Sequence, residues 1–266
     1  MIYFLSDAHI GSLAMPYDVY EHQRRVIQML NTFKKDATAI FLVGDIFDFW
    51  YEYQWRDKSK KQYSALIQCI RHLVKRGIAV HFLPGNHDLW TFGGLHKMTG
   101  IHVYHRAVKV ELNGKKVYMA HGDGLIPSGM EKIPQIRRFI RLSKFFHNPV
   151  AQKAFRFMPP QWGNAIGYNW AKKSRLKELA QPCPYKGEDK EELVLFSKEY
   201  EADPKHHHHD YYIYGHRHIA LDLPITPDSR VIILGDCFRQ YTYAQMDEKG
   251  EVTLKHFDSW IEEPNN

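Results

Sequence analysis

Short apolar runs alternate with amphipathic stretches in the first half of the chain. The apolar runs have the length and composition of buried strands, and they cover residues 1–7, 39–45 and 79–85. The stretches between them carry apolar residues three or four positions apart, which predicts helices over 17–35 and 63–77, the second closed by Gly77. This strand–helix–strand–helix–strand order predicts a parallel sheet with right-handed crossovers, and therefore an α/β fold.

Shorter strands flank a helical stretch in the second half. The strands and hairpins that we predict there cover 101–105, 108–122, 210–218, 229–236 and 242–257. The first hairpin turns at Asn113-Gly114, a dipeptide that favours a type I′ turn. The stretch of approximately 125–200 has helical spacing, with a break at Pro159-Pro160. We therefore predict one domain over residues 1–266 that contains a helical insertion at approximately 125–200.

Composition indicates an ordinary globular protein with one large core. The chain has 266 residues, of which 44% are hydrophobic and 25% are charged. It contains no run of about 18 apolar residues, the length that spans a bilayer. The first residues lack the basic region and cleavage site of a signal peptide. Three scattered cysteines form no CxxC pair, which predicts reduced thiols in a cytosolic protein at Cys69, Cys183 and Cys237.

The positive charge of the chain is concentrated in its middle. The net charge is +6, and the segment from Glu131 to Lys177 holds 11 Lys and Arg against one acidic residue, a balance of +10. The remainder has 25 basic and 29 acidic residues, a balance of −4. The segment therefore fits an anionic partner: nucleic acid, a phospholipid surface or a phosphorylated substrate. Its amphipathic stretch 130–146 suits a membrane interface, or packs its apolar face on the core with the cations solvated.

Five of the predicted strands end in a short polar cluster. These clusters contain Asp7 and His9, Asp45, Asn86 and His87, His121, and His216 and His218. Ligands of open α/β sheets bind beyond the carboxyl ends of the strands, so the five clusters can meet in one crevice. A glycine precedes the cluster in three cases, at "GDIFD", "GNHD" and "GHRH", and glycine permits the sharp turns that deliver side chains to a common point.

The residue types at these strand ends suit metal ions. Two Asp, four His and one Asn provide mixed oxygen and nitrogen ligands without a thiolate, which favours Mn²⁺, Fe or Zn²⁺ over Ca²⁺. Seven ligands are too many for one ion with an open position and about right for two ions that share a carboxylate. Two ions roughly 3.5–4 Å apart are a common device for hydrolysing phosphate esters. A histidine such as His121, taken alone, would instead suit an ordinary core position.

The ordered set D-x-H, G-D, G-N-H-D, H-G and G-H-x-H resembles the calcineurin-like metallophosphoesterase family from residue 1 to about 240. The resemblance implies a four-layer αββα sandwich with a two-metal site. One ion would be held by Asp7, His9, Asp45 and His218, and the other by Asp45, Asn86, His121 and His216. It also implies that His87 is the proton-handling residue at the leaving group, with Asp88 orienting its ring.

One branch of that family is more similar to the chain than the others, the UDP-2,3-diacylglucosamine diphosphatases of bacterial lipid A synthesis. The similarity includes "SDAHIG", "VGDIFDFW", "AHGD" followed by a helical insertion, "GHRH" and "VIILGDCF". It implies cleavage of a pyrophosphate to UMP and 2,3-diacylglucosamine 1-phosphate, with two divalent ions, Mn²⁺ before Fe or Zn²⁺. It further implies acyl chains held by the insertion, substrate contacts from Asn169 and Lys172, and a peripheral position on the cytoplasmic face of the inner membrane.

The chain departs from this branch in places, so other functions stay open. The best-known members carry Arg where this chain has His87, and "LGDCF" lacks a histidine that they contain. A soluble nucleotide or phosphodiester hydrolase of the same family would keep the metals and change the substrate. A nuclease is less favoured, and no nucleic acid is expected, because the cations lie among aliphatic residues without a stacking platform. A metal-binding scaffold is disfavoured because all seven ligand positions are filled, and the run His206–His209 fits a solvated loop.

Overall fold

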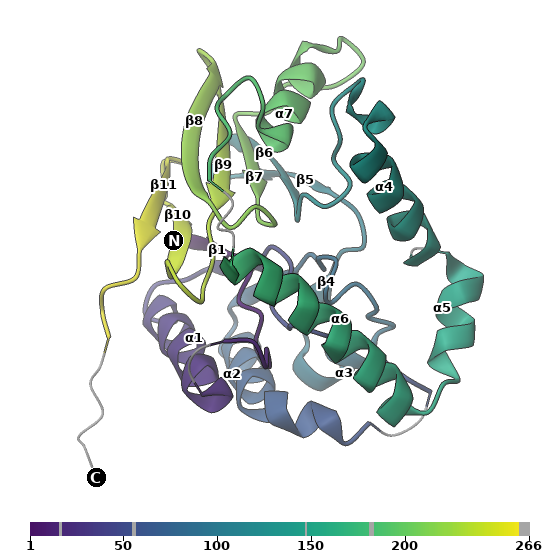
Figure 1. Ribbon diagram of the computed structural model, residues 1–266. Coiled ribbons are helices and arrows are strands. Elements are labelled where there is room, and N and C mark those ends of the chain that lie inside the picture. The colour runs from purple at the N-terminus through teal and green to yellow at the C-terminus, as the bar shows by residue number, and fades with distance from the viewer. Residues whose placement is uncertain (16–17, 55–56, 147, 181–183, 261–266) are drawn as a thin grey trace.

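Two β-sheets pack face to face in the computed structural model of the chain (Figure 1). The structure describes residues 1–15, 18–54, 57–146, 148–180 and 184–260. The first sheet has the order β11-β10-β1-β2-β3-β4, which corresponds to Val252–His256, Thr242–Met246, Ile2–Leu5, Ala39–Leu42, Ala79–Phe82 and His102–Val103. Strands β1 to β3 are parallel, as predicted, and β4 extends this parallel set. The hairpin β10–β11 adds antiparallel strands at the β1 edge.

The second sheet also has a parallel centre. Its order is β5-β6-β7-β9-β8, which corresponds to Val108–Leu112, Lys115–Ala120, Tyr211–Tyr214, Ser229–Leu234 and Ala220–Thr226. Strands β6, β7 and β9 are parallel, and β5 and β8 are antiparallel edges. The β5–β6 hairpin turns at Asn113 and Gly114, whose φ angles of 48° and 78° are both positive, as a type I′ turn requires.

Helices cover the outer faces of both sheets and complete the four predicted layers. Helices α1 (Val19–Phe33), α2 (Ser64–Lys75) and α3 (Gly94–Thr99) pack on the first sheet, and α7 (Glu192–Ala202) packs on the second. The space between the sheets is filled by apolar side chains from both, among them Phe4, Phe41, Val117, Ile213 and Ile232. Alternate residues of a strand point to opposite faces. Each sheet is therefore buried on one face by the other sheet and on the opposite face by helices.

The first helix shows how local sequence sets these layers. Asp18 caps α1, since its carboxylate accepts the backbone N–H groups of Tyr20 and Glu21. Val26, Leu30 and Phe33 follow at helical spacing and are buried against the first sheet. The apolar stripe therefore fixes which face of α1 meets the core.

Three helices follow in the middle of the chain. They are α4 (Pro134–Phe146), α5 (Pro149–Arg156) and α6 (Pro160–Ala180), and each begins with a proline, whose missing N–H costs nothing in the first turn. Helices α4 and α5 lie at the right of Figure 1, and α6 runs from the lower right to the centre. Helix α6 runs back toward the sheets, where Ala171 and Arg175 are buried. None of the described helices is both long enough and apolar enough to cross a membrane.

The sequence pattern did not predict β8 and α3. Strand β8 is an edge strand with a proline, Pro224, and a register irregularity beside it, so it lacks a clean alternation. Helix α3 has six residues, too few for a helical period to appear.

Cys69 and Cys237 are free thiols, as predicted, and Cys183 lies outside the described residues.

Candidate active site

The predicted ligands follow parallel strands whose carboxyl ends lie at one edge of the sandwich. Asp7 and His9 follow β1, Asp45 follows β2, and Asn86 follows β3, while His121 follows β6 and the pair His216 and His218 follows β7. Three groups place one ligand atom of each member within 4.8 Å of the others: Asp7, His9 and His218; Asp7, Asp45 and His121; and His9, Asp45 and His87. The two sheets therefore contribute to one buried cluster. We call it the Asp/His cluster, and its members are Asp7, His9, Asp45, His87, His121 and His218.

Asp45 lies between two parts of this cluster. Its Oδ2 is 3.8 Å from Nε2 of His9 and 3.4 Å from Nε2 of His121. On the His9 side, Oδ1 of Asp7 is 3.0 Å from Nε2 of His218 and 3.8 Å from Nε2 of His9. On the other side, the rings of His121 and His216 lie 5.2 Å apart. This geometry suits a carboxylate that bridges two cations, the role predicted for Asp45.

The backbone of the cluster is unusual. Five of the predicted ligands have a positive φ in the left-handed region: 52° at Asp7, 46° at His9, 52° at Asp45, 67° at His216 and 50° at His218. Residues with a side chain rarely adopt this conformation, and each such residue costs about 1–3 kcal/mol. Such strain is typical of functional sites, because the surrounding fold must hold the side chains in a required position.

Two glycines let neighbouring strand ends approach closely. A Cβ atom on Gly44 would lie 2.3 Å from Nδ1 of His121, and a Cβ atom on Gly85 would lie 2.2 Å from Oδ1 of Asp45. Both distances are far below van der Waals contact, so no other residue fits there without displacing a predicted ligand. Close approach, together with turning, therefore explains the glycines before Asp45 and Asn86.

The predicted pairing of His87 with Asp88 is wrong. Nδ1 of His87 lies 2.8 Å from the carbonyl oxygen of Asp48, and its backbone N–H donates to Oδ1 of Asp45. The Asp88 carboxylate instead accepts backbone N–H groups, from Gly85 in its own loop and from residues 45–47 in the loop after β2. A buried carboxylate needs several donors, and these N–H groups supply them. Asp88 therefore ties two ligand-bearing loops together, and a carbonyl orients His87.

Arg175 is a member of the site that the sequence analysis missed. It comes from α6 and is 2% exposed, and its Nη2 lies 2.7 Å from both ring nitrogens of His9. Its Nη1 lies 3.3 Å from Nδ1 of His218. Asp48 is a second missed member, with Oδ1 3.4 Å from Nδ1 of His9. The second Asp of "GDIFD" was a usable signal for Asp48, whereas Arg175 looks like one more cation of a basic helix.

The surroundings set the protonation of the cluster. Burial, and then the positive charge of Arg175, hold the pKa of His9 well below its ordinary value. Burial also lowers the pKa of His216. Burial alone would raise the pKa of Asp45 and lower that of His121, but their mutual attraction reverses both directions. His9 and His216 are therefore neutral at pH 7, which is the form that binds a metal ion.

The cluster fits the two divalent ions that its residue types imply. The donors are carboxylate oxygens, imidazole nitrogens and one amide oxygen, the set that Mn²⁺, Fe and Zn²⁺ accept. The amide oxygen of Asn86 is buried and has no hydrogen-bond partner among the described residues. A buried polar atom without a partner is costly, and a bound cation removes that cost. Asn86 therefore stays a predicted ligand of this centre, although it is in none of the three groups above.

The structure does not bring the other predicted substrate contacts to the cluster. Asn169 and Lys172 are exposed on α6, while Ala171 and Arg175 of the same helix face the core. Substrate contact by Asn169 and Lys172 stays a prediction.

In the run His206–His209, three side chains are exposed and His209 is buried, which agrees largely with a solvated loop.

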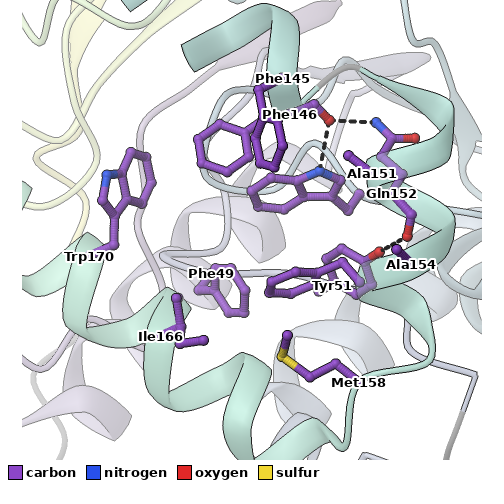
Figure 2. A pocket seen from close by; sticks show the side chains of 13 residues that line it. Phe49, Tyr51, Phe145, Phe146, Ala151, Gln152, Ala154, Met158, Ile166 and Trp170 are labelled. Atoms are coloured by element: carbon purple, nitrogen blue, oxygen red, sulfur yellow. Dashed lines mark hydrogen bonds between the residues drawn. The ribbon is translucent and has the colours of Figure 1, made fainter.

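An apolar cavity of about 480 Å³ lies among α4, α5 and α6 (Figure 2) and reaches the neighbourhood of the Asp/His cluster at Trp170. Its walls come from the loops after β2 and β3, the end of α4, and α5 and α6 with the turn between them. They are nearly all apolar, with contributions from Phe49, Tyr51, Trp90, Phe146, Phe155, Met158, Ile166 and Trp170. Trp90 Nε1 and Gln152 Nε2 donate to the carbonyl oxygen of Phe146, which joins α4 and α5 to the wall. The rings of Trp170 and His87 lie 5.0 Å apart, so Trp170 separates the cavity from the cluster.

Comparison with known proteins agrees with this geometry. The family model of the calcineurin-like phosphoesterases matches residues 1–220. The chain belongs to the calcineurin-like phosphoesterase family. This confirms the family predicted from the five strand-end motifs, and with it the prediction of a phosphoesterase.

Relatives named UDP-2,3-diacylglucosamine hydrolase align over almost the whole chain. One from Porphyromonas gingivalis is 34% identical over 259 residues, covering 92% of this chain and 94% of the relative. Another, from Pseudomonas savastanoi, is 24% identical and covers 97% and 96%. A solved dimetal phosphatase from Danio rerio is 12% identical with a TM-score of 0.43, covering 97% of this chain and 98% of that one, a likeness too distant to bear on function.

Proposed function

We propose that this protein hydrolyses the pyrophosphate of UDP-2,3-diacylglucosamine to UMP and 2,3-diacylglucosamine 1-phosphate. The observation that carries the proposal is the 480 Å³ apolar cavity beside the Asp/His cluster. Acyl chains need an apolar space, and a pyrophosphate needs cations, so the two compartments match the two parts of a lipid-linked nucleotide. The names of the full-length relatives support the same substrate.

Seven side chains would hold two divalent ions, which we propose to be Mn²⁺. Asp7, His9, Asp45 and His218 would bind one ion, and Asp45, Asn86, His121 and His216 the other. When bound, such ions lower the pKa of water to about 7 and neutralise charge that develops on a phosphoryl group. The left-handed backbone at five of these residues holds their side chains ready before substrate arrives.

Residues around the ions would handle protons and charge. His87 is the member of the cluster next to Trp170, and its Nδ1 is held by the carbonyl of Asp48, so Nε2 is the nitrogen left to face substrate. We assign His87 to protonate the departing oxygen. Arg175 adds a buried positive charge next to His9 and favours an anionic group there.

We further propose that the helical insertion at approximately 125–200 covers the lipid and meets the cytoplasmic face of a bacterial inner membrane. Nine of the exposed large apolar side chains among the described residues lie between Ile133 and Leu176. Arg137, Arg138 and Arg141 are exposed on α4 beside them. A surface that combines apolar and cationic side chains suits a membrane with anionic lipids.

A turnover assay with Mn²⁺ tests the proposal directly. UDP-2,3-diacylglucosamine, UDP-glucose and a small phosphodiester such as bis(4-nitrophenyl) phosphate would be compared at equal concentration, with release of UMP or nitrophenol as readout. We expect UMP from the lipid substrate and little from UDP-glucose. Equal rates on all three substrates would instead indicate a soluble nucleotide or phosphodiester hydrolase of the same family.

A further inference from the structure

A cleft of about 270 Å³ borders the Asp/His cluster at a different point from the apolar cavity. The apolar cavity reaches the cluster through Trp170 and His87, whereas His216 itself forms part of the cleft wall. The rest of the wall comes from Arg217 next to His216, residues 122–126 after β6, the first half of α4, and the start of α7 with Lys186 before it. No role assigned so far uses this space.

The cleft and the apolar cavity are the two ends of one path beneath α4. A small chamber of about 60 Å³ lies between them and contains Asn86 in its wall. The chamber shares Phe146 and Trp170 with the apolar cavity, and it shares Phe139 with the cleft. A molecule bound along this path would pass the predicted metal ligand Asn86 in its middle, with an apolar end on one side.

The lining of the cleft differs in chemistry from that of the cavity. Gln135, Lys186, Glu192 and Arg217 contribute polar and charged groups of both signs, whereas the cavity wall has Gln152 as its main polar side chain. The cations are held in place, because Nζ of Lys186 lies 2.6 Å from Glu192 and Nε of Arg217 donates to Glu191.

An aromatic ring adds a stacking surface to these polar groups. Phe139 is 37% exposed and its ring centroid lies 6.5 Å from that of His216, beside the cluster. An aromatic face accepts any planar nucleobase, and polar side chains around it bind the edges of the base and the sugar hydroxyls. The cleft therefore has the mixed polar and aromatic character of a nucleoside site.

We propose that this cleft binds the nucleoside half of the substrate. The inference rests on the proposed function: with acyl chains in the apolar cavity and the pyrophosphate at the Asp/His cluster, the nucleoside has to leave the cluster by another exit. The cleft at His216 is such an exit, and it holds cations for the phosphate that stays with the nucleoside. After hydrolysis, a nucleoside monophosphate remains there, while the lipid phosphate remains on the side of Trp170.

Narrowing the cleft tests this assignment by binding rather than by turnover. Ile136→Trp places a large side chain in the cleft wall, and Ile140→Trp is the matched control, one turn further along α4 and outside the described lining. Calorimetric titration of the Mn²⁺-loaded protein with UMP, and separately with 2,3-diacylglucosamine 1-phosphate, gives a Kd for each product. We expect Ile136→Trp to raise the Kd for UMP about tenfold or more and to leave the Kd for the lipid product unchanged. Gln135→Trp, at an exposed position of the same wall, gives a second test.

The outcomes separate the cleft from the proposed function. UMP affinity equal to that of the wild type in both cleft variants would overturn the assignment, and lipid hydrolysis by the same proteins would leave the proposed function intact. Loss of UMP affinity in the cleft variants alone would support the assignment. If the cleft variants lose UMP affinity but the wild type does not hydrolyse the lipid, the assignment of the nucleotide cleft is supported and the proposed lipid substrate is wrong.

Discussion

At the scale of single residues, the centre depends on side chains that reach one point from strands far apart in the chain. His121 illustrates this, because Nδ1 lies 3.0 Å from the carbonyl oxygen of Val43 and Nε2 lies 3.4 Å from Oδ2 of Asp45. The carbonyl contact orients the ring and leaves Nε2 directed at the carboxylate. Metal-binding histidines are commonly fixed in this way by a second contact on the other ring nitrogen.

We predict that His121→Ala abolishes turnover without unfolding the chain. The substitution removes one proposed ligand and opens a small space, so turnover should fall by more than about a hundredfold while far-ultraviolet circular dichroism stays unchanged. Elemental analysis should show a reduced Mn²⁺ content. Full activity of the variant would remove His121 from the metal set.

Arg175 should act on pH dependence through His9. Its positive charge adds to burial in lowering the pKa of His9, so removing that charge raises this pKa, and His9 takes up a proton at a higher pH. We predict that Arg175→Gln weakens Mn²⁺ binding more at pH 6 than at pH 8, by about tenfold against the wild type. Arg175→Lys keeps a charge and should restore most of the pH profile. A pH-independent loss in Arg175→Gln would indicate a purely structural role.

Two glycines with the same backbone angle separate strain from steric overlap. Gly44 and Gly77 both have a φ of 86°, but a Cβ on Gly77 meets nothing within 4 Å, whereas one on Gly44 meets His121. We predict that Gly77→Ala lowers the free energy of unfolding by about 1–2 kcal/mol and that Gly44→Ala costs about 1–3 kcal/mol more and reduces metal content. Urea unfolding measures both costs. Equal costs would show that the loop after β2 moves freely away from His121.

At the scale of elements, the ligand-bearing strands and the helical character of approximately 125–200 could be predicted from the sequence, but the face of α6 that meets the cluster could not. The strands that carry the ligands read as apolar runs, since parallel strands buried on both faces are apolar throughout. Helix α6 is different, because its buried positions mix small, polar and charged residues: Gly163, Asn164, Gly167, Ala171 and Arg175. No hydrophobic stripe marks the face that meets the cluster, so periodicity could not identify it.

The wall between α5 and the sheets gives a test of the apolar cavity. Ala151 lines the cavity, and Ala165 is exposed on α6 outside the described lining. We predict that Ala151→Trp fills the cavity and lowers turnover of the diacyl substrate by about tenfold or more, through a raised KM, while a small phosphodiester is hydrolysed at the wild-type rate. Ala165→Trp should leave both rates unchanged. Equal loss on both substrates in Ala151→Trp would argue against acyl chains in this cavity.

At the scale of the whole molecule, charge and exposed apolar area gather on the same side. The segment from Glu131 to Lys177 carries a balance of +10, while the remainder of the chain carries −4. Helices α4, α5 and α6 contain most of that segment; α4 and α5 lie beside the sandwich, and α6 runs back from them to the sheets (Figure 1). Such polarity orients a protein at an anionic surface, with the sandwich kept away from it.

We predict binding to vesicles that contain anionic lipid and weaker binding to neutral vesicles. Each exposed cation near such a surface contributes about 1 kcal/mol, so the combined substitutions Arg137→Glu, Arg138→Glu and Arg141→Glu should release most of the protein. Vesicle flotation at low and at physiological salt measures this, and salt should weaken the interaction.

The matched control reverses three cations elsewhere on the surface. Arg24, Lys35 and Lys75 are exposed on and beside α1 and α2, on the far side of the sandwich from α4. Their combined reversal to Glu should leave vesicle binding almost unchanged. An equal loss of vesicle binding in both triple variants would show that binding depends only on net charge, and it would argue against a docking face on α4.

The sequence by itself determined the family and the strand-end motifs that carry the predicted ligands. Strand-end motifs are local, since an apolar run and the polar residues after it stand next to each other in the chain, so "SDAH", "GDIFD" and "GHRH" could be read directly. The parallel order of β1 to β3 and the β5–β6 hairpin follow from similarly local patterns. The local pattern also identified Asp88 as part of the motif "GNHD", but the partner predicted for it from that pattern, the neighbouring His87, was wrong.

Only the tertiary structure decided which contacts join distant segments. Arg175 reaches His9 across 166 positions of the chain, and Asp88 bonds a loop more than 40 positions away. The apolar cavity and the cleft at His216 likewise combine helices with loops of the core. Periodicity reports which face of an element is buried, but it does not report what that face meets, because the partner is selected by packing of the whole chain.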